Sequence, residues 1–211
     1  MKTIPLFPIG IVIFPGATLP LHIFEVRYRE LVDTCLKNNT EFGINFVEVA
    51  KMHNVGCTVK ITQMLEKYPD GRMDIAVTGQ KRYHLKNMRD GEQKYYVGDI
   101  ETFDDSDDEV DVELTIECME SYNDIVKVVF GAHEVLSSLK EVGPVKPSFF
   151  FAQKCGLTLE QKQELLEMNS ENKRLEFLKK HMGEILPKVK QVEYIENIIR
   201  SDGYFKPPTI E

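Results

Sequence analysis

Few residues in the sequence have types and spacing that could perform catalysis. His133 and Glu134 begin the zinc-binding pattern H-E-x-x-H, but residue 137 is Ser, so the second histidine is missing. Ser148 and Lys154 could form the nucleophile and base of a Ser-Lys peptidase, which also needs a desolvated lysine and an oxyanion hole. The sequence contains neither G-x-x-x-x-G-K-[ST] nor G-x-G-x-x-G, the two patterns that hold phosphates. We therefore predict a protein that is not an enzyme, with no catalytic residues, no metal site and no cofactor.

An uncharged segment near the start of the chain could bind another macromolecule. Residues 4–24 hold four prolines and no charged side chain. They could form barrel strands and turns, or line an apolar groove for extended polypeptide, by pocket contacts or by strand addition at an open edge. The predicted protein-binding residues are Phe14, Pro15, Leu19, Pro20, His22, Phe24, Glu25, Arg27, Tyr28 and Arg82.

A basic cluster offers RNA binding as the alternative function. Lys81, Arg82, Lys86 and Arg89 surround the aromatic Tyr83, and the cluster could bind a nucleic acid or be a solvated strand end. The charge of the chain disfavours nucleic acid, because the formal net charge is -8 and neutralisation of phosphates supplies most of such affinity. We expect a protein partner rather than a nucleic acid.

The composition also bears on where the protein is found. The prolines and glycines of residues 4–24 would break a membrane-spanning helix repeatedly, and a single Lys2 is a weak basic region for a signal peptide. The four cysteines form no C-x-x-C pair and are typical of buried thiols in a reducing compartment. We predict a cytoplasmic protein without membrane association.

The first half of the chain reads as a set of strands. Apolar and polar residues alternate over residues 55–61 and again over 73–77, and the turn 68–71 between them has the sequence Tyr-Pro-Asp-Gly, which predicts a hairpin. Further strands are expected at 42–46 and 95–100, and one helix at 25–37. Short strands with a single helix favour a small closed barrel.

The second half has helical periodicity. One long apolar stripe covers residues 116–139, and shorter helices are expected at 147–154 and from Thr158, whose hydroxyl and the Gln161 side chain form a capping box. A last stripe runs from Ser170 to Ile199, kinked or divided at Pro187. These helices predict a bundle.

An acidic run at 104–109 separates the two halves and marks the expected domain boundary. The predicted division is a barrel domain at 1–103, an acidic linker or helix entrance at 104–113, a helical bundle at 114–203 and a tail at 204–211.

Seven motifs follow one another along the first half of the chain. They are Ile4-Pro5-Leu6-Phe7-Pro8, Phe14-Pro15-Gly16, Leu19-Pro20-Leu21-His22-Ile23-Phe24-Glu25, Arg27-Tyr28, Val55-Gly56-Cys57, Tyr68-Pro69-Asp70-Gly71-Arg72 and Gly79-Gln80-Lys81-Arg82-Tyr83. With these motifs, in this order and spacing, the chain resembles the N-terminal substrate-binding domain of Lon proteases. The resemblance implies an α+β fold, a PUA-like β pseudo-barrel of about six strands followed by an α-helical bundle. In full-length Lon this region helps to recognise substrates and assemble the hexamer, and the ATPase and the Ser-Lys peptidase lie downstream.

The resemblance and the residues together predict a non-catalytic module without ATPase or peptidase that binds unfolded polypeptide segments or a partner protein. Since other PUA-like folds bind RNA, an RNA-binding domain remains the alternative. The oligomeric state, and a role as adaptor, inhibitor or chaperone, stay open.

Overall fold

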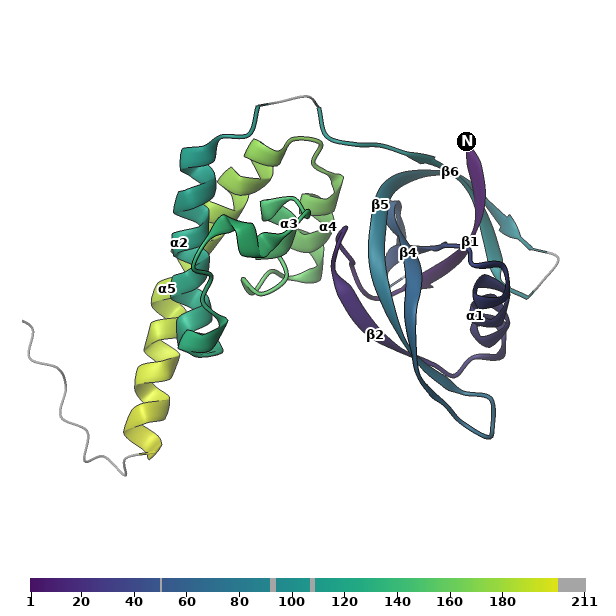
Figure 1. The fold of residues 1–211 in the computed structure, drawn as a ribbon, viewed down its shortest axis with the longest axis horizontal. Coiled ribbons are helices and arrows are strands. Elements are labelled where there is room, and N and C mark those ends of the chain that lie inside the picture. The colour runs from purple at the N-terminus through teal and green to yellow at the C-terminus, as the bar shows by residue number, and fades with distance from the viewer. Residues whose placement is uncertain (50, 92–93, 107–108, 201–211) are drawn as a thin grey trace, which may run out of the picture. The chain divides into compact units, whose positions relative to one another are not determined.

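The computed structural model describes residues 1–49, 51–91, 94–106 and 109–200, with side chains up to residue 195 (Figure 1). The predicted tail, 204–211, lies outside the described residues. The chain divides into two compact units, one made of Met1–Asp108 with Leu157–Glu171 and the other of Glu109–Gly156 with Asn172–Glu211. We call them the barrel unit and the helical unit.

The barrel unit is built on six strands, which confirms the predicted α+β pseudo-barrel. They are β1 (Lys2–Ile9), β2 (Thr18–Ile23), β3 (Phe42–Glu48), β4 (Lys51–Lys67), β5 (Met73–Asp90) and β6 (Tyr96–Thr102). Their order is β2-β5-β4-β3-β1-β6, and β6 also pairs with β5, so five strands close into a ring. Strand β2 pairs antiparallel with the first half of β5 and is not part of this ring (Figure 1). Helix α1 (Val26–Asn38) follows β2 directly.

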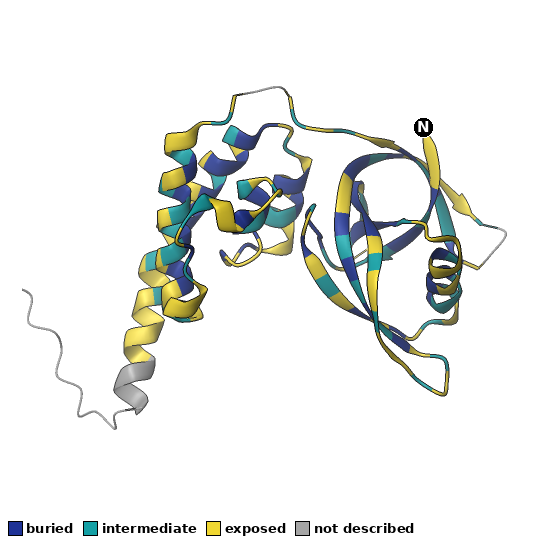
Figure 2. Cartoon of the chain, in the orientation of Figure 1, coloured by how far each residue is buried: buried dark blue, intermediate teal, exposed yellow. Residues whose placement is uncertain are grey.

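Alternation along these strands positions the barrel core. Ile4, Leu6, Tyr83, Leu85 and Ile100 form one buried cluster. Most of their neighbours in sequence are more exposed, and the strands in Figure 2 are banded accordingly, although Phe7 and Arg82 are buried as well. The predicted hairpin is confirmed as β4 and β5, with Gly71 at a positive φ of 86° in its turn.

The helical unit contains α2 (Val112–Val129), η1 (Ala132–Glu134), η2 (Leu139–Val142), α3 (Pro147–Phe151) and α5 (Glu171–Arg200). The prediction of one long stripe over 116–139 was wrong. Helix α2 ends at Val129 because Gly131 has a φ of 95°, a backbone conformation that no α-helix contains. Pro187, by contrast, does not divide α5, which continues to Arg200.

Helix α4 (Leu159–Glu167) begins at the predicted capping box, in which Gln161 N donates to Thr158 Oγ1 and Thr158 N to Gln161 Oε1. It was expected in the bundle domain, but the structure assigns it to the barrel unit. Hydrogen bonds hold α4 on the barrel: Gln163 Nε2 donates to Val55 O of β4 at 3.0 Å, and Arg82 of β5 donates to Leu166 O at 3.1 Å. The acidic run at 104–109 also differs from the predicted linker, because the Asp105 side chain is buried in an ion pair with Arg82.

All four cysteines are buried free thiols, as the sequence predicts. Burial raises the pKa of Cys57 to about 12 and also raises that of Cys35. Because the thiolate is the reactive form, we expect the native protein to resist an aromatic disulfide reagent such as DTNB and all four thiols to react after unfolding in guanidinium. The measurement is thiol absorbance over an hour with and without denaturant. Rapid labelling of a thiol in the folded protein would contradict the burial of these side chains.

No helix within the described residues is long and apolar enough to span a membrane. Nor do three or more His, Cys, Asp or Glu side chains gather there in a group that could hold a metal ion.

Candidate functional site

A pocket of about 330 Å³ opens in the barrel unit where β1 ends, β2 ends and α1 begins. The residues lining it are Phe7, Pro8, Ile9, His22, Ile23, Phe24, Glu25, Arg27 and Tyr28. Its base is aromatic, because the rings of Phe7 and Tyr28 lie 4.1 Å apart and both residues are buried. Such a base can receive an apolar side chain.

The rim of this pocket combines an exposed aromatic with a charged pair. Phe24 is 61% exposed, and its ring lies 6.1 Å from that of His22. Arg27 Nη2 lies 2.8 Å from Glu25 Oε2, and the Arg27 guanidinium sits 4.6 Å from the centre of the Tyr28 ring. Since this pair largely neutralises its own charge, the pocket offers apolar contact with a polar edge rather than a net charge.

Strand β2 leads into the pocket, and in the part of the chain that the structure describes it pairs on one side only, with β5. Gly79 N donates to Ala17 O at 2.9 Å. In an antiparallel pair every second residue points its backbone groups at the partner strand, so Ala17 and the alternate residues after it face β5. The backbone groups of Thr18, Pro20 and His22 therefore face the open edge. Pro20 has no N–H, so this edge offers N–H donors only from Thr18 and His22.

The end of β2 that meets the pocket is held by a hydrogen-bond network on the exposed face of the sheet. His22 Nδ1 lies 2.5 Å from Asp74 Oδ1, and Tyr68 Oη donates to Asp74 Oδ2 at 2.6 Å. These hydrogen bonds, first from Tyr68 and then from His22, lower the pKa of Asp74 below its ordinary 3.8. The same bond to Asp74 raises the pKa of Tyr68 to about 12. The network keeps the His22 ring at the mouth of the pocket.

The structure brings together five of the ten predicted binding residues, namely His22, Phe24, Glu25, Arg27 and Tyr28, all of which line the pocket. Leu19 and Pro20 lie in β2, half-buried and exposed respectively, while Phe14 is buried in the loop before β2 and Pro15 follows it half-buried.

Arg82 occupies a different environment. Its guanidinium binds Asp105 and the carbonyls of Leu166 and Met168, and its side chain is 4% exposed. It is a buried structural cation and is not among the residues that line the pocket.

Sequence reasoning missed the contribution of Phe7, Pro8, Ile9 and Ile23. All four belong to the uncharged segment that the sequence singled out, so composition was the available signal. The contact of Phe7 with Tyr28 joins residues 21 positions apart and depends on the parallel pairing of β1 with β3, which a single sequence does not reveal.

The basic cluster is largely paired with acids. Besides the Arg82–Asp105 pair, Lys86 Nζ lies 2.8 Å from Glu101 Oε2 and Arg89 Nη1 lies 2.7 Å from Asp99 Oδ2. Each acid reduces the attraction that its cation could offer to phosphate. These contacts weigh against the RNA-binding alternative.

The two catalytic candidates also have other partners. Arg174 Nε donates to Ser148 Oγ at 2.8 Å, while Lys154 Nζ binds Glu134 Oε2 at 2.6 Å. Neither contact joins Ser148 to Lys154 as a nucleophile to its base. His133 is exposed in η1.

A family model described as the ATP-dependent protease La (LON) substrate-binding domain matches residues 3–184. The chain belongs to this family. Lon relatives include the Lon proteases of Buchnera aphidicola subsp. Acyrthosiphon pisum, 27% identical over 191 residues, and of Escherichia coli strain K12, 27% identical over 189 residues. Each alignment covers 83% of this chain and 24% of the relative, so the chain spans about a quarter of the Lon proteases that it matches.

Solved Lon structures have the same fold. The Lon N-terminal domain protein from Xanthomonas campestris has a TM-score of 0.65 at 24% identity and covers 84% of this chain and 97% of its own. The N-terminal domain of the Mycobacterium avium complex Lon protease also scores 0.65, at 19% identity, over 86% of this chain and 98% of its own. The resemblance seen in the sequence is thus confirmed for both family and fold.

Proposed function

We propose that this chain is a non-catalytic module that binds unfolded or extended polypeptide at the pocket between β1, β2 and α1. The observation that carries the proposal is Phe24, an aromatic side chain left 61% exposed on the rim of a 330 Å³ pocket with an aromatic base. Folding alone would favour covering such a ring, whereas aromatic side chains beside apolar pockets supply much of the binding energy at protein interfaces. The family model, named for substrate binding, supports a polypeptide ligand.

The geometry gives a mode of recognition for one extended segment. An apolar side chain of the ligand enters the pocket and contacts Phe24, Phe7 and Tyr28. The ligand backbone pairs with the open edge of β2, where Thr18 and His22 supply the N–H donors. Because Pro20 removes one N–H donor from the edge of β2, the pocket provides more of the affinity than the strand edge does. The module therefore selects its ligand mainly by the one side chain that enters the pocket.

The absence of an activity of its own remains part of the proposal, as does a cytoplasmic location. The match is to a substrate-binding domain, and Ser148 and Lys154 are engaged by Arg174 and Glu134. The proposed role is recognition, with any chemistry performed by another domain or protein.

Substitution of Phe24 by aspartate is expected to weaken binding of a fluorescently labelled, permanently unfolded polypeptide such as reduced casein by about 30-fold, or about 2 kcal/mol, because an aromatic anchor is lost. Fluorescence anisotropy measures the dissociation constant, and circular dichroism checks the fold. Phe24→Leu keeps an apolar rim and should lose less than about 5-fold.

Met88→Asp is the matched control, because Met88 is an exposed apolar residue of β5 that does not line the pocket. It introduces the same charge and should bind like the original chain. Equal losses for Phe24→Asp and Met88→Asp would show that charge alone weakens binding and would overturn the pocket assignment.

A further inference from the structure

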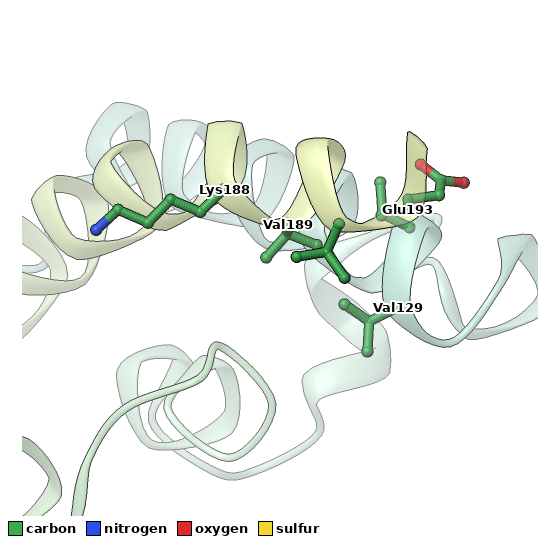
Figure 3. A pocket seen from close by; sticks show the side chains of 6 residues that line it. Val129, Lys188, Val189 and Glu193 are labelled. Carbon is green, nitrogen blue, oxygen red and sulfur yellow. The ribbon is translucent and has the colours of Figure 1, made fainter. Parts of the chain in front are cut away.

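A second apolar surface lies in the helical unit, on elements that the proposed polypeptide site does not use. It is a groove of about 410 Å³ between the end of α2 and the later part of α5, lined by Val128, Val129, Lys188, Val189, Val192 and Glu193. Figure 3 shows Val129 and Val189 on its two sides, with Lys188 and Glu193 toward opposite ends. Four valines make this a strip that water solvates poorly.

The later part of α5 leaves this strip largely uncovered. Val192 is 57% exposed and Ile195 is 46% exposed, and Val129 on α2 is 53% exposed. Figure 2 shows the change along α5, from buried residues in its first half to exposed residues further on. Val189, Val192 and Ile195 are spaced by three residues and so share one face of the helix. A helix this exposed gains stability from burying its apolar face against a partner.

The sequence of this segment is symmetrical about Val192. Val189 and Ile195 lie three positions before and after it. Two antiparallel copies related by a two-fold axis at Val192 would therefore place apolar residues opposite apolar residues at each of these positions.

Charge selects the antiparallel arrangement. Lys188 lines the groove before Val192, and Glu193 lines it after Val192. In an antiparallel pair the basic half of one copy lies beside the acidic half of the other, whereas a parallel pair would put like charges together.

We propose that this face is a self-association surface, on which α5 of a second copy of this chain packs antiparallel across the groove with Val192 at the two-fold axis. The partner's Ile195 then lies opposite Val189, close to the Val128 and Val129 wall. One helix face with its groove is a small interface, so dimerisation is expected at roughly micromolar concentrations. The proposal is independent of the polypeptide site in the barrel unit.

Sedimentation equilibrium of the full chain from about 1 to 200 µM tests the proposal. The original chain is expected to pass from monomer to dimer within this range. Val192→Glu would set two carboxylates together at the axis and should raise the dimer dissociation constant at least 30-fold. A strictly monomeric original chain, or Val192→Glu dimerising as strongly as the original, would overturn the proposal.

Disulfide trapping tests the geometry, since the native cysteines are all buried. Under mild oxidation Val192→Cys should form a linked dimer, while Lys190→Cys, an exposed position on the opposite helix face, should not. A mixture of Val189→Cys and Ile195→Cys chains should cross-link to each other rather than to themselves. Self-linking of Val189→Cys would indicate a parallel pair and would overturn the antiparallel arrangement.

Discussion

Replacing Arg82 by methionine is expected to lower the free energy of unfolding by about 3–5 kcal/mol, the usual cost of removing one partner from a buried ion pair. Arg82 Nη2 lies 2.5 Å from Asp105 Oδ1, and Nη1 donates to the carbonyls of Leu166 and Met168 at the end of α4. The guanidinium also lies 4.4 Å from the centre of the Phe103 ring. Methionine fills part of the volume but supplies no charged donor to the carboxylate or the carbonyls.

Urea denaturation followed by far-ultraviolet circular dichroism measures this loss. Arg72→Met is the control, because Arg72 pairs with Asp70 in an exposed turn and such pairs contribute less than about 1 kcal/mol. Arg82→Lys should fall between the two, since one ammonium cannot reproduce the planar set of donors. An Arg82→Met protein as stable as Arg72→Met would mean that the buried pair is not what fixes α4 to the barrel.

The second large effect is expected at Gly79, where a methyl group has no room. A Cβ on Gly79 would lie 2.1 Å from the carbonyl oxygen of Phe14 and 2.9 Å from its carbonyl carbon. Both are backbone atoms, and Gly79 also exchanges hydrogen bonds of 2.9 Å with Gly16 and Ala17. Alanine must therefore push β5 away from the loop before β2. We expect a loss of about 3 kcal/mol or more, from overpacking together with weakened hydrogen bonds.

Gly183→Ala makes the matched comparison. Gly183 lies inside α5, and nothing approaches within 4 Å of its Cβ position, so alanine should stabilise the helix by about 0.5–1 kcal/mol. Thermal unfolding should show a midpoint lowered by roughly 6 °C or more for Gly79→Ala and slightly raised for Gly183→Ala. If both variants melted within a degree of the original chain, the close approach of the Phe14 loop to β5 would be refuted.

The sequence predicted those parts of the fold that depend on local patterns. The β4–β5 hairpin follows from alternation and the turn at Gly71, and the start of α4 follows from the capping box. The pattern over 116–139 misled because apolar spacing continues past Gly131, where the backbone leaves the helix. Periodicity also indicates that α4 is a helix, but it does not indicate which surface the helix packs on. That surface is fixed by hydrogen bonds of Gln163 and Arg82 to residues far away in the sequence.

The candidate site was predictable to the extent that it is contiguous. His22, Phe24, Glu25, Arg27 and Tyr28 lie within seven residues, so one unusual segment placed them together. The other wall of the pocket comes from the end of β1, and its approach to α1 follows from sheet topology. Arg82 resembled a surface residue because the acid and the carbonyls that bury it come from segments 23 to 86 positions away.

The place of α4 also bears on how the chain is made. Arg82 leaves the ribosome long before Met168, whose carbonyl it binds, and the residues between Asp105 and Met168 include the first segment of the helical unit, Glu109–Gly156. At translation rates of about 5–20 residues per second, those 63 residues take roughly 3–13 s to add. During that interval the nascent barrel exposes the surface of β4 and β5 that α4 later covers. The vulnerable period of this protein is therefore during synthesis, when a chaperone that shields this surface would have most effect.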